Sequence, residues 1–312
     1  MVWRGGSNLM DLYLVAPFMK TVKPTIIETL HSNVLYNFYS GKKDVDKDWQ
    51  YVKFYGGKIF VDSGAFSAWT RGVKIDVDDY IKWLNERDYI DLCGQLDTIP
   101  GDRVYGATLD QVNEAARMTW ENYLYMYERV KNPKRLLYTF HVGEPIEFLK
   151  QALEWRDSNE EPIEYIALGG MVGKSTAIRK SFLDKCFEII ENSSNPFVKV
   201  HTFGMTSVSL LRQYPITSCD STSWALTGAM GNIAMDVGII AVSSQQKNDP
   251  NYYLYLPKEA REAFEKSILD LGFNIEELAE DANKRAIFNA TYMKSKIDNI
   301  VYQGRLKHKS LF

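Results

Sequence analysis

Residues that can do chemistry recur at the ends of short apolar runs in this 312-residue chain. They comprise three aspartates, two histidines and a pair of glycines: Asp62, Asp97, His141, Gly169, Gly170, His201 and Asp220. Paired carboxylates suit nucleophilic and general acid–base catalysis, and glycines allow a backbone to approach a ligand closely. Singly, each residue has a plainer explanation. An Asp at a strand end commonly forms a turn or caps a helix, and a His within a strand is commonly structural.

The apolar runs that precede these residues alternate with helix-like stretches. Runs rich in β-branched and aromatic residues predict strands over 12–16, 33–38, 58–62, 89–97, 136–141, 165–168, 198–203 and 216–220. Helices are predicted over 77–87, 109–131, 145–158 and 174–192, with Asp76 and Thr108 as N-caps. This alternation predicts an α/β fold, a TIM (β/α)8 barrel, with an open doubly wound sheet as the alternative. In a barrel the polar residues would converge at the carboxyl ends of the strands, where active sites of this fold lie.

The residues after the eighth run predict a helical extension. A segment of small residues over 225–244 is followed by a break at Asn248-Asp249-Pro250 and by two charged helices predicted over 257–271 and 275–300. No stretch between them resembles a long linker. We therefore expect a single domain over residues 1–312, with a barrel core over 1–250 and an extension over 251–312 made of the final helices and a basic tail.

The composition limits the class of protein. The 37 Lys and Arg residues against 40 Asp and Glu give a formal charge of −3, without the basic surplus usual for a nucleic-acid binder. The apolar runs are too short to cross a bilayer, and the first residues contain no apolar signal core, so we expect a cytoplasmic protein with no membrane contact. Cys93, Cys186 and Cys219 lie far apart, which argues against disulfides and against a zinc ribbon.

Four of the polar motifs resemble, in order and spacing, those of the tRNA-guanine transglycosylases. They are Val61-Asp62-Ser63-Gly64-Ala65-Phe66, Leu96-Asp97-Thr98-Ile99-Pro100, Ala167-Leu168-Gly169-Gly170 and Cys219-Asp220-Ser221-Thr222-Ser223-Trp224-Ala225. The resemblance covers about residues 12 to 231 and implies an enzyme that exchanges a guanine in a nucleic acid for a 7-deazaguanine. Exchange with retained configuration at C1′ needs two displacements and therefore a covalent sugar–enzyme intermediate. By the family pattern Asp220 is the nucleophile, and Asp62 is the general acid/base that protonates the departing guanine.

The resemblance also implies a set of residues that bind the base. The set is Asp97, Ser63, Gly169, Gly170 and His141. Asp97 would accept from N1–H and the exocyclic amine of the base, and the glycine amides would approach O6. His141 stands where bacterial members have a Gln. Apart from the resemblance, Phe66, Trp69, Met171 and Trp224 lie beside the motif loops, and we expect them to sandwich the flipped base. The plainer readings stay open: Asp97 as part of a turn before Pro100, and His141 and His201 as structural residues.

The chain departs from the family in ways that favour a related branch. The family's zinc site, three Cys and one His, has no counterpart in the sequence, so we expect neither a metal nor another cofactor, and we expect no RNA-binding accessory domain. Both differences fit the branch of phages and bacteria that inserts 7-deazaguanines into DNA. We predict such a pentosyltransferase, with a preQ0-like base as small-molecule substrate and, for a phage protein, the host cytoplasm as location. A tRNA-guanine transglycosylase and a catalytically silent nucleic-acid-binding barrel are the alternatives.

A DNA substrate would need its target base flipped out of the duplex and its backbone held by cations. Lys174, Arg179 and Lys180 follow the glycine pair and are the predicted backbone contacts, with Lys284-Arg285 and the Arg305–Lys309 tail as further candidates. Since the overall charge is negative, these cations would form a local basic track. An accessory protein or a homodimer is left open.

Overall fold

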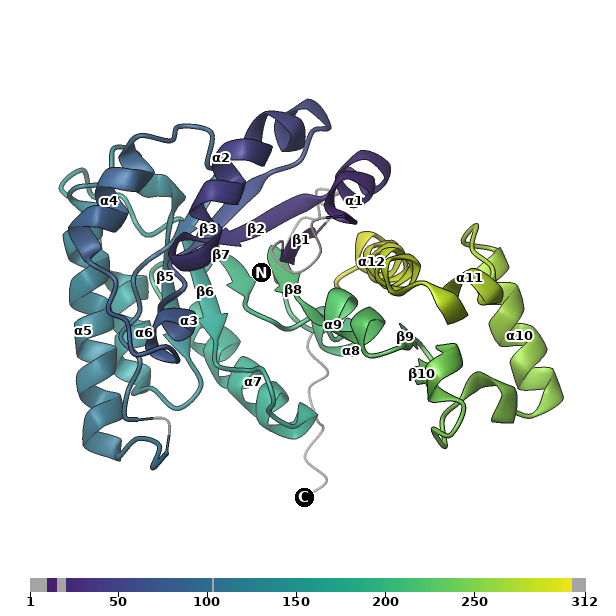
Figure 1. Ribbon diagram of the computed structural model, residues 1–312. Coiled ribbons are helices and arrows are strands. Elements are labelled where there is room, and N and C mark those ends of the chain that lie inside the picture. The colour runs from purple at the N-terminus through teal and green to yellow at the C-terminus, as the bar shows by residue number, and fades with distance from the viewer. Residues whose placement is uncertain (1–9, 16–20, 103, 305–312) are drawn as a thin grey trace, which may run out of the picture.

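The computed structural model describes residues 10–15, 21–102 and 104–304, and its eight parallel strands form the predicted TIM barrel (Figure 1). The strands are β1 (Asp11–Val15), β2 (Asn33–Asn37), β3 (Ile59–Asp62), β4 (Leu92–Gly94), β5 (Leu136–His141), β6 (Tyr165–Gly169), β7 (Lys199–Thr202) and β8 (Ser218–Ser221). They pair in chain order, and β8 returns to β1, with Asp220 beside Tyr13. This last pairing closes the sheet and excludes the open doubly wound alternative.

The strand boundaries match the predicted runs within a few residues, with one marked exception. Only Leu92–Gly94 of the predicted 89–97 run is strand. The following residue still donates its N–H to Leu137 O at 3.2 Å, after which the chain leaves the ladder and carries Asp97 into a loop. The predicted end of the first strand, Ala16, lies outside the described residues.

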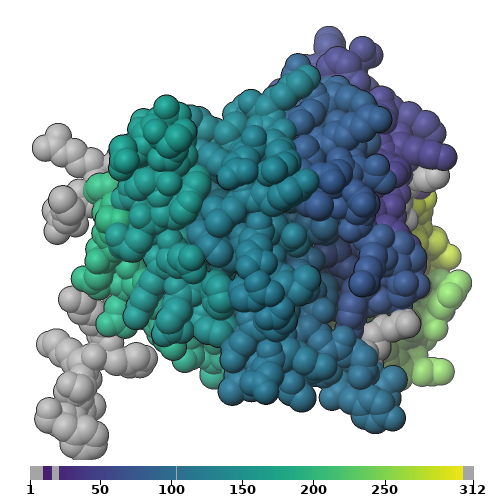
Figure 2. Space-filling model, turned by 90° about the vertical axis from the view of Figure 1, so that its left-hand side faces the viewer, coloured from purple at the N-terminus to yellow at the C-terminus, as the bar shows by residue number. Residues whose placement is uncertain are grey.

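Helices surround the barrel and connect its strands. They are α1 (Lys23–Leu30), α2 (Phe38–Phe54), α3 (Ala65–Trp69), α4 (Val77–Asn85), α5 (Leu109–Tyr127), α6 (Ile146–Glu154), α7 (Thr176–Asn192), α8 (Val208–Leu211) and α9 (Ser223–Ala229). Asp76 caps α4, and Thr108 forms a capping box with Gln111 at the start of α5, so both predicted N-caps are confirmed. Seen from the side of α4 and α5, the middle of the chain forms a continuous outer surface (Figure 2).

The core has two layers, one inside the barrel and one between the strands and the helices. Side chains alternate along a strand, so every second residue points inward. The inner layer holds Tyr13, Val15, Leu35, Phe60, Leu137, Tyr165 and Ala167. The barrel is therefore filled by side chains, and its inward-facing polar residues are held in a rigid setting.

The part of the chain after β8 differs from the prediction. The small-residue segment contains the end of α9 and a hairpin of β9 (Asn232–Met235) and β10 (Gly238–Ala241). The three helices α10 (Lys258–Leu269), α11 (Ile275–Glu280) and α12 (Ala282–Asp298) follow. The predicted helix over 275–300 is thus wrong, because Asp281 has an extended conformation and caps α12 with its carboxylate.

The hairpin and the final helices share a small apolar cluster of their own. It contains Ile233, Ile240, Val242, Phe264, Ile268, Leu278 and Phe288. From this cluster α12 extends back to the barrel, where it contacts α9, α1 and β1. Within the described residues, no helix combines the length and the apolar character that a membrane span requires. The division of the chain at residue 250 stays a prediction.

Candidate active site

The three predicted carboxylates lie at the carboxyl end of the barrel. Asp62 is the last residue of β3, Asp97 follows β4 by three residues, and Asp220 lies near the end of β8. Asp97 and Asp220 both act electrostatically on the carboxyl of Asp62. The fold therefore brings together residues that are far apart in the sequence, as the barrel predicts.

Asp62 begins a turn that holds one of its carboxyl oxygens, while the other oxygen lies toward Gly94. Its Oδ2 accepts the N–H of Gly64 at 3.1 Å. A Cβ atom at Gly94 would lie 3.4 Å from Oδ1, so the absence of a side chain there keeps room for the carboxyl. Burial raises the pKa of Asp62 to about 7, assisted by the charges of Asp97 and Asp220 and opposed by the N–H of Gly64. A carboxyl with this pKa can both give and take a proton near neutral pH.

Asp220 is oriented by two donors that both reach the same oxygen. Its Oδ1 accepts from the backbone N–H of Gly204 at 2.9 Å and from Nε2 of His201 at 3.2 Å. Gly204 follows β7 with a φ of 62°, a left-handed conformation that glycine adopts without strain. Among the described residues Oδ2 has no hydrogen-bond donor, so this oxygen keeps its lone pairs for another contact. Asp220 is only 7% exposed.

Asp97 is tied to a second group of polar residues after β5. Its Oδ1 accepts from Gln95 at 3.2 Å, and its Oδ2 lies 3.6 Å from Nε2 of His141. The other side of the imidazole faces Glu144, which accepts from the His141 backbone N–H at 2.8 Å and lies 3.0 Å from Nδ1. Burial lowers the pKa of His141, but Asp97 and Glu144 outweigh it and raise the pKa to about 9. His141 is therefore an imidazolium between two carboxylates near neutral pH.

The glycine pair at the end of β6 makes room for this imidazolium. Gly169 is paired with His141 across the two strands, and a Cβ atom at Gly169 would lie 2.5 Å from His141 Cδ2. Gly170 has a φ of 74°, and its Cβ atom would lie 3.1 Å from the backbone nitrogen of Val142. Glycine is thus needed at both positions for packing and backbone conformation, in addition to any approach to a base.

The remaining residues of the predicted base site lie in different environments. Ser63 is fully buried, and its hydroxyl accepts the N–H of Ala65 at the start of α3. Phe66 is 64% exposed on α3, with its ring beside that of Trp69. Met171 is 0% exposed and belongs to the core between strands and helices, so its side chain has no surface toward a pocket.

The predicted backbone contacts also differ from one another. Lys174 is exposed in the loop before α7, and Arg179 donates to the carbonyl of Lys174 at 2.8 Å. Lys180 forms an ion pair with Asp184 at 2.7 Å, so its ammonium already has a counter-charge beside it. Arg285 is 5% exposed and donates to backbone carbonyls that include Gly228 O, so it joins α12 to α9 and is not available to a phosphate. The Arg305–Lys309 tail lies outside the described residues.

Some residues of the site were not anticipated from the sequence. Gln95 and Glu144 hold Asp97 and His141, and Gly204 donates to Asp220. Phe203 lies against the ring of His201 and close to Gly94, on the side where Asp62 Oδ1 points. Each follows or precedes a predicted site residue by two or three positions, and this proximity is the one signal that the sequence contained.

The described residues contain no group of three or more His, Cys, Asp or Glu side chains arranged to hold a metal ion, so they do not fit the zinc site of the transglycosylases. No family model matches the chain, and a search of curated proteins finds no significant relative.

Proposed function

We propose that this protein is a guanine transglycosylase that exchanges a guanine base in DNA for a preQ0-like 7-deazaguanine. The observation that carries the proposal is the contrast between two neighbouring carboxyl groups. Asp62 has a pKa of about 7. Asp220 is oriented by two donors on Oδ1, and its Oδ2 has no hydrogen-bond donor among the described residues. Such a pair can divide the roles of general acid and nucleophile between its members.

The proposed reaction has two displacements at C1′ of the target nucleotide. In the first, Asp220 Oδ2 forms a bond to C1′ while the bond from C1′ to guanine N9 breaks and Asp62 protonates the departing base. In the second, Asp62 takes a proton from the incoming 7-deazaguanine, whose N9 displaces the Asp220 carboxylate from C1′. Two inversions leave the configuration of the sugar unchanged, and the polymer backbone stays intact.

Base recognition in this proposal falls to Asp97 and the β6 loop. Asp97 has one oxygen near Gln95 and one near His141, and each oxygen keeps a lone pair for N1–H or the exocyclic amine of the base. The backbone amides of Gly169 and Gly170, at the end of β6, would face O6 of the base. Phe66, exposed on α3, supplies an apolar surface for the nucleotide to contact.

The choice of DNA as polymer rests on the missing zinc ligands and is tested directly. Purified protein is given labelled guanine with either duplex DNA or tRNA, and the label in each polymer is counted. Label in DNA supports the proposal, and label in tRNA alone overturns the choice of DNA. Label in neither, with the protein folded, overturns the transglycosylase and favours the silent binding barrel.

The nucleophile is tested with one variant and a matched control. Asp220→Asn should abolish label transfer and the covalent protein–DNA adduct detected by intact mass. Asp88→Asn removes a carboxylate from an exposed turn between α4 and β4 and should leave both unchanged. An Asp220→Asn protein that still transfers label would overturn the assignment.

A further inference from the structure

A buried chain of hydrogen bonds extends from Asp220 through the barrel interior. His201 Nε2 lies 3.2 Å from Asp220 Oδ1, and His201 Nδ1 lies 2.6 Å from the hydroxyl of Ser218. The Ser218 hydroxyl in turn lies 2.6 Å from that of Tyr165. Because side chains alternate along a strand, Ser218 and Asp220 point to the same inner face of β8, and the strand register places His201 directly beside Ser218.

The order of donors along this chain follows from its two ends. Burial raises the pKa of Tyr165, so its hydroxyl keeps its proton, and the Ser218 oxygen is the acceptor within reach of that proton. Ser218 then has its own proton for His201 Nδ1, which must accept. The imidazole is left with its proton on Nε2, directed at the carboxylate of Asp220. Every donor in this arrangement has an acceptor, whereas the opposite tautomer would set a lone pair of Nε2 against a carboxylate oxygen.

The imidazole is also confined by aromatic rings. Tyr13, Phe60 and Phe203 surround it, with ring centroids 6.2, 4.9 and 4.6 Å from that of His201 and interplanar angles of 72 to 76°. His201 itself is 0% exposed. Because the ring has no room to rotate, the direction of its Nε2–H is set by the barrel interior.

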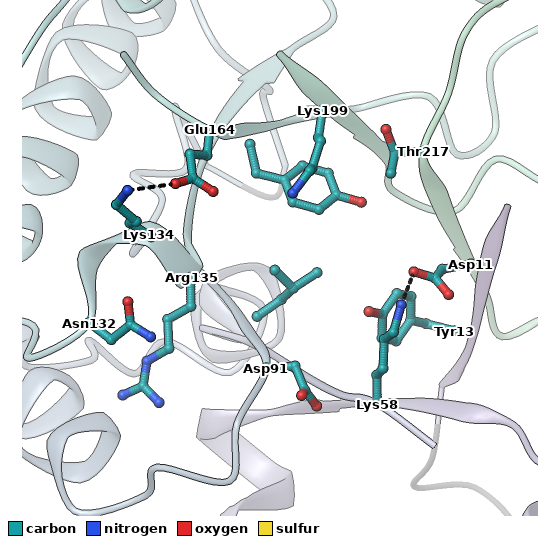
Figure 3. A pocket seen from close by; sticks show the side chains of 12 residues that line it. Asp11, Tyr13, Lys58, Asp91, Asn132, Lys134, Arg135, Glu164, Lys199 and Thr217 are labelled. Atoms are coloured by element: carbon teal, nitrogen blue, oxygen red, sulfur yellow. Dashed lines mark hydrogen bonds and ion pairs between the residues drawn. The ribbon is translucent and has the colours of Figure 1, made fainter. Parts of the chain in front are cut away.

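The same three residue types make up the Ser–His–Asp triad of hydrolases, but here the exposure is reversed. Ser218 is 0% exposed and cannot meet a substrate, whereas Asp220 reaches the carboxyl end of the barrel. Tyr165, at the other end of the hydrogen-bond chain, lines a cavity of about 570 Å³ at the amino-terminal end of the barrel. The ion pairs Lys58–Asp11 and Lys134–Glu164 stand around that cavity (Figure 3). Of the four residues joined by these hydrogen bonds, Asp220 is the one at the carboxyl end of the barrel, where the proposed reaction takes place.

We propose that His201 is a positioning residue for Asp220, held in one tautomer and one orientation by Ser218 and Tyr165. The inference rests on the proposed function, in which Asp220 Oδ2 bonds to C1′. The Nε2–H and the N–H of Gly204 then hold Oδ1 throughout. They stabilise the carboxylate more than the sugar ester, so they favour release of Asp220 in the second displacement.

The tautomer is tested without any substrate by nitrogen-15 NMR of the imidazole rings. The chain has four histidines, and loss of one set of signals in His201→Phe identifies those of His201. We expect Nε2 to carry the proton and Nδ1 to be an acceptor in the wild type. Ser218→Ala should give a mixture of tautomers. A proton on Nδ1 in the wild type would overturn the proposed chain.

The role in catalysis is tested by comparing two replacements of the same residue. His201→Phe retains an aromatic ring among Tyr13, Phe60 and Phe203 but has no donor, and it should lower kcat by about 10- to 100-fold, the effect of one hydrogen bond to a charged group. KM for DNA should stay unchanged, and the covalent adduct should accumulate because its breakdown is slowed. His201→Gln retains an N–H donor and should recover part of kcat.

Two further variants separate positioning from folding. Tyr165→Phe removes the end of the chain and should lower kcat by a smaller factor. Tyr138→Phe removes another buried hydroxyl, one without a hydrogen-bond partner among the described residues, and should have no effect. If His201→Phe is as active as His201→Gln, the positioning role is wrong. If the wild type exchanges no base, the proposed function and the catalytic role of His201 fail together. The NMR result still decides whether the hydrogen-bond chain from Tyr165 to Asp220 exists.

Discussion

Asp62→Asn should make the protein more stable at pH 8 while abolishing base exchange. The substitution is nearly isosteric, and the amide oxygen of Asn can still accept the N–H of Gly64 that now binds Asp62. What it removes is a charge that the folded state disfavours. Burial is the main reason, and the charges of Asp97 and Asp220 add to it.

The magnitude follows from the shift in pKa from 3.8 to about 7. Since one pKa unit corresponds to 1.36 kcal/mol, the charged form of Asp62 costs the folded state about 4 kcal/mol. Between these two pKa values the folded state holds a proton that the unfolded state has lost. The contribution of Asp62 to stability is therefore complete below pH 3.8 and is lost as pH rises through 7. From pH 8 to pH 5 the wild type should regain about 3 kcal/mol from this group, and the Asn variant should not.

Urea unfolding of both proteins at pH 8 and pH 5 measures this difference. The variant should have the higher free energy of unfolding at pH 8, and the gap should shrink or reverse by pH 5. Asp88→Asn, in an exposed turn, serves as the control and should change neither value. A variant no more stable than the wild type at pH 8, or a difference independent of pH, would show that burial does not raise the pKa of Asp62.

Three further outcomes test the rest of the site. Burial lowers the pKa of His141, but Asp97 and Glu144 raise it to about 9. The charged imidazole therefore stabilises the fold below pH 6.5, and this contribution is lost as pH rises through 9. Glu144→Gln should accordingly lower the urea midpoint at pH 6 more than at pH 10. Gly169→Ala sets a Cβ atom 2.5 Å from His141 Cδ2 and should cost about 1–3 kcal/mol of stability, measured by urea unfolding, with a raised KM for the incoming base. Phe66→Ala, at an exposed position, should change stability by less than about 0.5 kcal/mol yet weaken DNA binding in a fluorescence titration. Met171→Ala, at a core position, should cost about 2–5 kcal/mol of stability. The opposite pattern would show that Met171 contacts the DNA and Phe66 stabilises the fold.

Local sequence signals accounted for much of the barrel. The eight apolar runs became eight strands because parallel strands buried on both faces need continuous β-branched and aromatic residues. Asp76 and Thr108 were predictable as N-caps because a cap depends on neighbours within three residues. The β9–β10 hairpin was missed because its strands, Asn-Ile-Ala-Met and Gly-Ile-Ile-Ala, mix large and small residues without a clear alternation.

Pairings between distant segments were beyond the reach of such signals. Glu144 could be seen near His141 in sequence, but its effect depends on Asp97, which approaches the imidazole from another loop. Gly169 suggested close approach to a ligand, and the register of β5 and β6 adds that it accommodates the His141 ring. Met171 was named for its place beside the glycines, yet its direction into the core depends on the path of the loop after β6.

The reactive residues at the strand ends were recognisable from the amino-acid sequence, because strand and turn propensities act over a few neighbouring positions. Which of these residues act on one another depends on the three-dimensional fold. The closure of β8 onto β1, the pKa of Asp62 and the hydrogen bonds from Tyr165 to Asp220 all depend on distances between strands. Electrostatic and hydrogen-bond energies depend on the distance between two groups in space, and that distance cannot be read from the number of residues between them.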